Sequence, residues 1–173
     1  MPSPLTKLCL CLLTLAFFHN SYAQRAGKVL EQQNIRSAIL HKDVHYTVYL
    51  PADYETSDRT YPVVYLLHGY SDDNTGWLQF GEINRLADKA IAEGTIPPMI
   101  IIMPNGDSSF YINSYDGKEK YEDFFINEFM PTVETAYRIK AQKRYRGVAG
   151  LSMGGYGTLI YTMIPTSSPQ APP

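Results

Sequence analysis

The sequence has few cysteines, little net charge and only one long apolar run. Its two cysteines, Cys9 and Cys11, both lie in that run near the N-terminus. Removal of this segment would leave no thiol, which excludes a disulfide framework, a cysteine-based metal site and a cysteine nucleophile. The formal net charge of −2 provides no basic surface of the kind that binds nucleic acid.

The apolar run is typical of a signal peptide. Lys7 supplies a short positive start, residues 8–18 are apolar, and Ser21 and Ala23 place small residues at the positions that signal peptidase reads. We therefore expect a signal peptide over residues 1–23 and a secreted or periplasmic protein with no stable membrane insertion after cleavage. The alternative is an uncleaved N-terminal anchor, although the run is short for a membrane span.

Residues 24–163 carry the hydropathy patterns of one α/β domain. Alternation over residues 44–50 predicts an antiparallel strand with one buried face, preceded by a strand over 34–40 and a frayed segment over 24–30. Continuous apolar runs farther along predict strands that are covered on both faces. The further predicted strands are 62–67, 98–103 and 146–151, and the predicted helices are 81–93, 121–137 and 153–163.

Two interruptions complete this pattern. Residues 107–120 are rich in glycine, serine, asparagine and tyrosine and predict a long loop, a kind of segment that is often functional. Pro131 predicts a kink or break within the helix over 121–137. The order of elements predicts a mixed, mostly parallel sheet with helices on both faces.

One motif carries chemistry. Gly150-Leu151-Ser152-Met153-Gly154 fits G-x-S-x-G and lies between a predicted strand and a predicted helix, the context that a nucleophile elbow requires. Ser152 is therefore the candidate nucleophile. The helix N-terminus would offer free N–H groups to a developing oxyanion, among them that of Met153. The alternative is a glycine-rich turn with a bystander serine.

The segment His68-Gly69-Tyr70 ends the first buried strand. In a fold with a nucleophile elbow, the loop after this strand supplies the second oxyanion N–H, which we assign to Tyr70. His68 is expected to hold the loop by hydrogen bonds rather than to act in catalysis. His41 and His45 are expected at the surface or at a sheet edge.

Several ordered motifs extend from about residue 37 to residue 163. They are Tyr49-Leu50-Pro51 with Tyr54, the runs 61–69, 72–77 and 103–106, Tyr121-Glu122-Asp123-Phe124, and the run 150–155. Together they resemble the putative-esterase family of α/β-hydrolases, which includes feruloyl esterases, acetylxylan esterases and the esterase D type. The resemblance implies an α/β-hydrolase fold and a serine carboxylesterase that works through an acyl-enzyme on Ser152, with no metal and no organic cofactor.

The resemblance also implies a class of substrate. Relatives often act on ester groups of plant cell-wall polysaccharide, so we expect feruloyl or acetyl esters on such a polymer or on its oligosaccharides. Trp77, Phe110, Tyr111 and Tyr115 lie in loops expected near the carboxyl ends of the strands, where they could stack on sugar or aryl rings. The alternative for each is ordinary loop packing.

The chain departs from the family pattern after the serine. The family order is Ser, then Asp or Glu, then His, but no Asp, Glu or His follows Ser152 here. Two triad members are therefore absent, and we expect a hydrolase domain that is incomplete at its C-terminus. The chain as written is expected to be inactive or severely impaired.

The last residues also differ in composition. Residues 164–173 are rich in proline and serine and cannot continue the helix, so we expect an aberrant tail. A single-nucleotide deletion after the Met163 codon would explain it, and a natural short paralogue or gene fragment is the alternative.

The sequence also leaves other functions open. They are a small-acyl esterase, an esterase D-type thioester hydrolase, a non-catalytic carbohydrate-binding module and an inert fragment. A signal peptide argues against the usually cytosolic thioester role.

Overall fold

A computed structural model describes residues 26–163 of the 173-residue chain. The predicted signal peptide, residues 1–23, and the predicted aberrant tail, residues 164–173, lie outside the described residues. The elements are β1 Lys28–Arg36, β2 Asp43–Leu50, η1 Tyr54–Thr56, β3 Val63–Leu67, α2 Gly76–Gln79, α3 Ile83–Ala92, β4 Ile100–Pro104, α4 Tyr121–Phe124, η2 Phe125–Phe129, α5 Met130–Ala136, η3 Lys143–Tyr145, β5 Arg146–Gly150 and α6 Met153–Met163. None of the helices within 26–163 is long and apolar enough to cross a bilayer.

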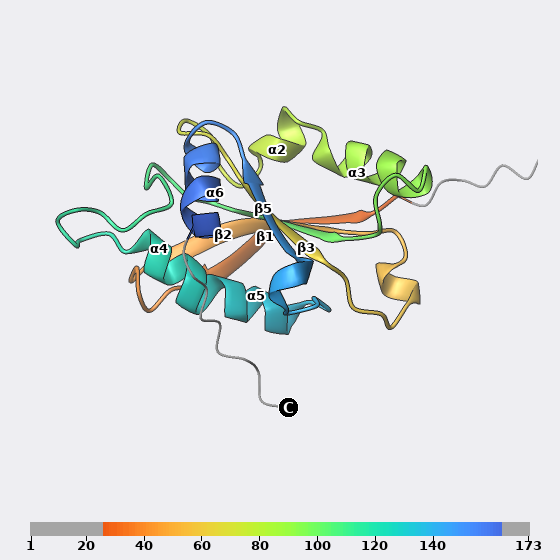
Figure 1. Cartoon of the computed structure of the whole chain (residues 1–173), viewed down its shortest axis with the longest axis horizontal. Helices are drawn as coiled ribbons and strands as arrows, with labels where there is room; N and C mark the ends of the chain where they lie inside the picture. The colour runs from red at the N-terminus through yellow and green to blue at the C-terminus, as the bar shows by residue number, and fades with distance from the viewer. Residues whose placement is uncertain (1–25, 164–173) are drawn as a thin grey trace, which may run out of the picture.

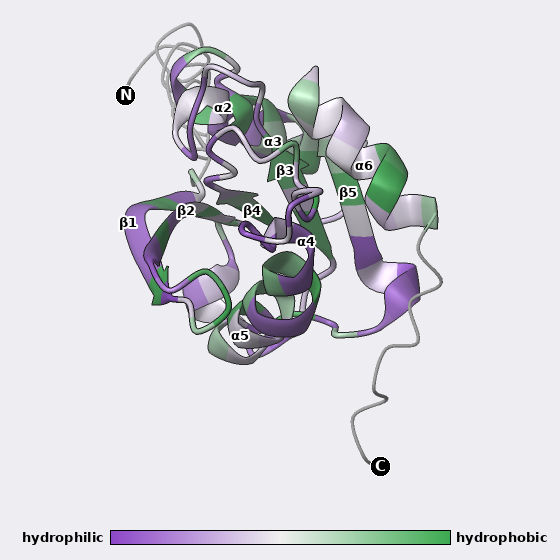
Figure 2. Ribbon diagram, turned by 90° about the vertical axis from the view of Figure 1, so that its left-hand side faces the viewer, coloured by the Kyte–Doolittle hydropathy of each residue, from purple (hydrophilic) through white to green (hydrophobic). Residues whose placement is uncertain are grey.

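A mixed five-stranded sheet forms the centre of the molecule (Figure 1). Its strand order is β1-β2-β4-β3-β5, in which β3 runs parallel to both β4 and β5. Strands β1 and β2 are antiparallel, and so are β2 and β4. The sequence-based prediction of a mixed sheet is confirmed. Figure 2 shows that the central strands are largely apolar, as expected for strands covered on both faces.

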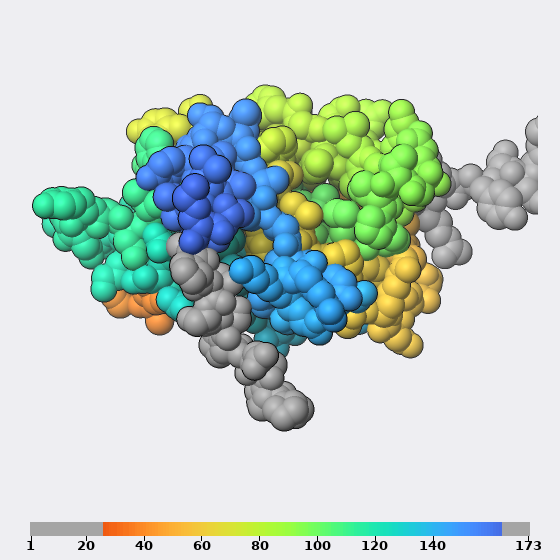
Figure 3. All heavy atoms as spheres, viewed as in Figure 1, coloured from red at the N-terminus to blue at the C-terminus, as the bar shows by residue number. Residues whose placement is uncertain are grey.

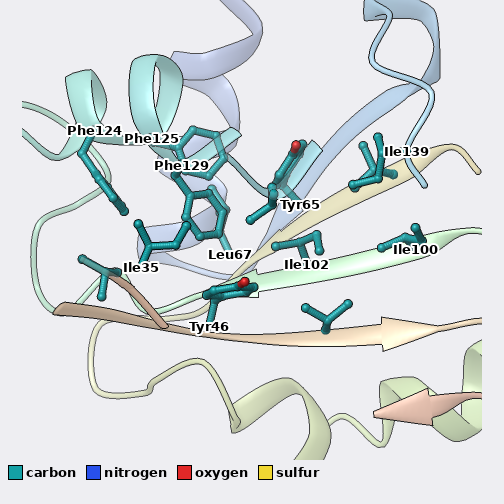
Figure 4. Close-up of a cluster of buried hydrophobic side chains, with 14 of the residues drawn as sticks. Ile35, Tyr46, Tyr65, Leu67, Ile100, Ile102, Phe124, Phe125, Phe129 and Ile139 are labelled. Atoms are coloured by element: carbon teal, nitrogen blue, oxygen red, sulfur yellow. The ribbon is translucent and has the colours of Figure 1, made fainter. Parts of the chain in front are cut away.

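Helices cover both faces of this sheet (Figure 1). Helices α2 and α3 pack Trp77, Leu78 and Ile83 on one face. The other face holds the larger apolar cluster, to which α4, η2, α5 and α6 contribute. Figure 4 shows Phe124, Phe125 and Phe129 lying over the side chains of the strands.

The first strand differs from its prediction. β1 begins at Lys28, inside the segment expected to be frayed, and ends at Arg36, whereas residues 37–40 form a bend. β1 exists because it pairs with β2, from Lys28 opposite Leu50 to Arg36 opposite Asp43. An edge strand of this kind carries many polar residues, so its hydropathy pattern is weak.

The second strand is more deeply buried than its alternation predicts. Thr47 and Tyr49, expected on an exposed face, are fully buried beneath the segment that contains α2 and α3. Their polar atoms are satisfied there, because Asn74 Nδ2 donates to Thr47 Oγ1 at 2.8 Å and Tyr49 OH donates to Asp88 at 2.7 Å. Burial, together with the hydrogen bond to Asp88, raises the pKa of Tyr49 well above its usual value.

The predicted kink at Pro131 corresponds to a change in helix winding. Helix α4 continues through the π-helical turn Phe125–Phe129 into α5, which has Pro131 in its first turn. Proline has no N–H and its ring would clash with the preceding turn, which a wider turn relieves. The turn also carries Glu128, which accepts hydrogen bonds from Ser37 Oγ at 2.6 Å and from the N–H of Ala38 at 2.7 Å.

Candidate active site

Ser152 occupies a sharp turn between β5 and α6. Its backbone φ is 53°, in the left-handed region that a residue with a side chain rarely adopts. Two glycines make the turn possible: a methyl group on Gly154 would overlap the carbonyl oxygen of Leu67, and one on Gly150 would overlap the backbone of Gly154. The strand–turn–helix context predicted for the motif is therefore confirmed, and its glycines are required by close backbone contact.

The loop after β3 lies beside this turn. Leu151 N–H donates to Leu67 O at 3.3 Å, and a methyl group on Gly69 would lie 3.9 Å from Ser152 Cβ. Tyr70 follows Gly69 directly, and Met153 is the first residue of α6. Both predicted oxyanion donors thus belong to segments next to Ser152, but their assignment stays a prediction.

His68 links the loops that follow β3 and β4. The N–H of Gly106 donates to its Nε2 at 2.8 Å, so Nδ1 carries the proton and donates to Gly69 O at 2.7 Å. The ring is 1% exposed and both nitrogens are occupied. The expected structural role of His68 is confirmed, and the ring has no nitrogen left for a general base.

The described residues show no base paired with Ser152. His41 lies in the turn before β2 and His45 lies on β2, both exposed as expected. No histidine within 26–163 makes a hydrogen bond with the Ser152 hydroxyl. Over the same range, no three or more His, Cys, Asp or Glu side chains gather in a way that could hold a metal ion.

A hollow of about 580 Å³ opens beside Ser152. This volume lies within the range of roughly 300–1,000 Å³ that small-molecule sites occupy. Its lining combines the turn and α6 with the loop 107–120: Ser109, Phe110, Ile112, Ser114, Ser152, Met153 and Tyr156. The lining contains hydroxyl and apolar groups and no charged side chain. The site therefore suits an uncharged group next to the Ser152 hydroxyl.

Among the aromatic residues predicted to contact substrate, Phe110 lines this hollow. It is 43% exposed, and its ring centroid lies 6.2 Å from that of Tyr156 and 5.7 Å from that of Tyr70. Tyr156 and the Tyr70 ring were not predicted from the sequence. The usable signal for Tyr156 is its position four residues after Ser152, one helical turn along the same face.

The other three aromatic residues predicted to contact substrate do not line the hollow. Tyr111 has no exposed surface and donates its OH to His68 O at 3.2 Å, so its prediction as a substrate contact is wrong. Trp77 is a partly buried residue of α2 that packs against the apolar cluster on that face, and its Nε1 donates to Leu67 O at 3.1 Å. It does not line the hollow. Tyr115 is fully exposed in the protruding loop (Figure 3) and does not line the hollow.

Comparisons with known proteins agree with this geometry. A family model described as "Putative esterase" matches residues 37–165. The chain is 37% identical over 123 residues to an endo-1,4-beta-xylanase/feruloyl esterase of Xylanibacter ruminicola, covering 67% of this chain and 17% of that protein. It thus spans a small part of this curated relative.

Solved structures show the same similarity. A ferulic acid esterase superposes with a TM-score of 0.73 and 36% identity, over 79% of this chain and 54% of that one. The substrate-bound fluorophosphonate-binding serine hydrolase F of Staphylococcus aureus superposes with a TM-score of 0.67 and 30% identity, over 79% of this chain and 51% of that one. The chain spans about half the length of these two structures.

Proposed function

This chain belongs to the "Putative esterase" family of α/β-hydrolases, and we propose that it carries the nucleophile of a secreted serine carboxylesterase. The observation that supports this most directly is the strained backbone of Ser152, with φ at 53°, at the N-terminus of α6 and at the rim of the hollow. Backbone packing at the two glycines presents the hydroxyl to solvent. A bystander serine would not need this conformation.

In the proposed reaction, Ser152 Oγ attacks the ester carbonyl carbon and loses its proton to a base. The carbonyl oxygen becomes an oxyanion, which the N–H groups of Tyr70 and Met153 would stabilise together with the helix dipole. The oxyanion then collapses, the alcohol leaves with a proton, and an acyl-enzyme remains. Water attacks this acyl-enzyme, releases the acid and returns the proton to the serine.

The described residues do not supply the base that would take the proton from Ser152 Oγ. No Asp, Glu or His follows Ser152 in the sequence, and both ring nitrogens of His68 are occupied. We therefore propose that the 173-residue chain by itself hydrolyses esters slowly. Serine enzymes that lack their triad keep a residual rate from the oxyanion hole and binding, on the order of 10³–10⁴-fold over water.

The proposed substrates are feruloyl or acetyl esters on plant cell-wall polysaccharide. The names of the Xylanibacter relative and of the solved ferulic acid esterase support this class. The uncharged lining of the hollow suits a neutral ester. Turnover of methyl ferulate compared with an aryl acetate would separate the two acyl groups.

Covalent labelling tests the nucleophile directly. A fluorophosphonate forms a bond between phosphorus and an activated serine oxygen as fluoride leaves, and mass spectrometry of peptides locates it. We expect the label on Ser152, with slow kinetics because no base pairs with Ser152 in the described residues, and no label in Ser152→Ala. Equal labelling of Ser152→Ala, or labelling only at other serines, would refute the assignment.

Secretion and binding need separate tests. Expression in a bacterium with the first residues intact should give a mature protein beginning at Gln24, which N-terminal sequencing would detect. An intact Met1 would contradict the proposed secretion. Saturable binding of arabinoxylan oligosaccharides without any serine labelling would instead favour a carbohydrate-binding module.

A further inference from the structure

Two neighbouring residues of the loop 107–120 share an unusual backbone. Phe110 and Tyr111 both have left-handed φ values, 55° and 61°. This conformation costs roughly 1–2 kcal/mol per residue that carries a side chain. Two such residues in succession need strong compensating contacts. The two side chains also differ in burial, since Tyr111 is fully buried and Phe110 is 43% exposed.

Tyr111 supplies the compensating contacts. Its OH donates to His68 O at 3.2 Å, and its carbonyl oxygen accepts a hydrogen bond from Tyr161 OH of α6 at 2.7 Å. Its ring lies edge-on to Tyr121, with centroids 5.4 Å apart. Burial raises the pKa of the Tyr111 hydroxyl well above its usual value, so it remains a donor.

Two glycines leave room for Tyr111. A methyl group on Gly106 would lie 2.5 Å from Tyr111 Cε1, and one on Gly157 would lie 2.7 Å from Tyr111 Cβ. Tyr111 Cβ sits next to the backbone and cannot swing away as the end of a flexible side chain could. Gly157 in α6 therefore fixes how closely the loop approaches the helix.

The position of Phe110 follows from that of Tyr111. Its ring centroid lies 5.7 Å from that of Tyr70 and 6.2 Å from that of Tyr156, and all three residues are about half exposed. Phe110 and Tyr156 line the hollow that contains Ser152. Exposed aromatic faces beside an uncharged hollow favour an uncharged ring with an apolar face.

We propose that Phe110 and Tyr156 determine specificity at the candidate ester site by receiving an uncharged ring of the substrate, and that Tyr111, packed against Gly157, positions Phe110 for this. The inference rests on the proposed esterase function, because it assumes that Ser152 is the reacting group. The ring can come from the acid side of the ester, as an aryl group, or from the alcohol side, as a sugar.

The test measures binding of two probes to the full chain with Ser152→Ala, which prevents turnover. Methyl ferulate carries its ring on the acid side, and acetylated xylobiose carries its rings on the alcohol side. We expect Phe110→Ala to weaken binding of at least one probe by about five- to tenfold. Loss confined to one probe identifies the side from which the ring comes, and unchanged binding of both overturns the proposal.

A pair of glycine variants tests the positioning role. Gly157→Ala should weaken the same probe as Phe110→Ala and should speed hydrogen exchange at the backbone amides of residues 107–112. Gly155→Ala is the matched control in the same helix, because its methyl group would meet only Gly150 O at 3.5 Å. Equal effects of the two alanines would overturn the positioning role.

Labelling with a ring-free fluorophosphonate separates this inference from the proposed function. It is measured on the chain that retains Ser152. If Ser152 is labelled but Phe110→Ala and Gly157→Ala do not alter probe binding, the inference fails alone. If Ser152 is not labelled, the proposed function fails. Should Gly157→Ala not fold, Phe110→Ala still decides specificity, since it shortens a half-exposed side chain.

Discussion

At the scale of single residues, Gly154 packs against the end of β3, where a methyl group would overlap Leu67 O. Gly154→Ala should therefore lower the free energy of unfolding by about 1–3 kcal/mol, the usual range for added bulk in a packed interior. Guanidinium unfolding followed by circular dichroism would measure this. Gly155→Ala should be neutral or stabilising, because alanine is favoured over glycine in helices by up to about 1 kcal/mol. Similar losses in both variants would contradict the packing argument.

The side-chain directions of the adjacent residues Phe110 and Tyr111 could not be predicted from the sequence. Both are aromatic residues of one loop and were predicted to contact substrate, but only Phe110 reaches the hollow. Their directions depend on the backbone and on Gly157, which lies 46 positions after Tyr111 in the sequence. The sharp turn at Ser152, in contrast, was predictable because its motif and its flanking elements are local.

At the scale of elements, one ion pair joins α5 to β5. Arg146 donates from Nε to Glu134 Oε1 at 2.5 Å and from Nη2 to Oε2 at 2.6 Å, and Tyr65 OH also donates to this carboxylate at 3.0 Å. The side chains are only 19% and 7% exposed. The hydrogen bond to Glu134 raises the pKa of Arg146 above its usual value.

Removal of the Glu134 charge should lower the free energy of unfolding. Glu134→Gln leaves the Arg146 charge without its partner, which typically costs about 3–5 kcal/mol of stability. The control is Glu82→Gln, since the Glu82–Arg85 pair has side chains 59% and 74% exposed, and exposed pairs contribute about 0–1 kcal/mol. Thermal and denaturant unfolding of both variants would compare them. A loss of stability in Glu134→Gln no larger than that in Glu82→Gln would contradict this prediction.

A second element-scale link depends on pH. Partial burial opposes the charge of Glu128, but hydrogen bonds from Ser37 Oγ and from the N–H groups of Ala38 and Ile39 outweigh it, with a smaller contribution from His41. Together they hold the pKa of Glu128 below its usual range. The stabilisation is therefore present above the unfolded-state pKa of about 4.3 and is lost as pH falls through the lower folded-state value.

We expect the turn before β2 to loosen under acid. Hydrogen exchange at the amides of Ala38 and Ile39, corrected for the intrinsic pH dependence of exchange, should accelerate below about pH 4. In Glu128→Gln these amides should exchange faster already at neutral pH, and the acceleration of exchange below about pH 4 should disappear. An acceleration that persists unchanged in the variant would show that another group controls the turn.

The elements themselves were predictable to different degrees. Strands β3, β4 and β5 and helix α6 lie within two residues of their predicted bounds, because continuous apolar runs and the motif define them locally. β1 was misplaced because pairing with β2, rather than its own hydropathy, makes it a strand. The short α2 was missed, and no periodic pattern can reveal a helix of four residues.

At the scale of the whole molecule, the β5 side of the sheet is apolar and uncovered in the described residues. Within 26–163, β5 pairs with β3 and with no second strand. Leu151 is 63% exposed, and Leu159 and Met163 of α6 are 56% and 73% exposed. Unpaired strand edges beside apolar surface favour association between molecules.

We expect this surface to promote self-association of the chain. Leu159→Lys should lower concentration-dependent light scattering of the purified chain, because it places a charge within the apolar surface. Phe80→Lys is the matched control, since Phe80 is 81% exposed and follows α2 on the opposite face of the sheet. If both lysines reduce scattering equally, net charge rather than the β5 side governs association.

The turn at Ser152 has a practical consequence. Its position is fixed by backbone contacts of Gly150 and Gly154 rather than by its own side chain, so a side chain of similar size should occupy the same place. Both native cysteines lie within residues 1–23, so Ser152→Cys in a chain that begins at Gln24 would carry a single thiol. The helix N-terminus should lower the pKa of that thiol. A fluorophore attached there would report ligand entry into the hollow without any turnover.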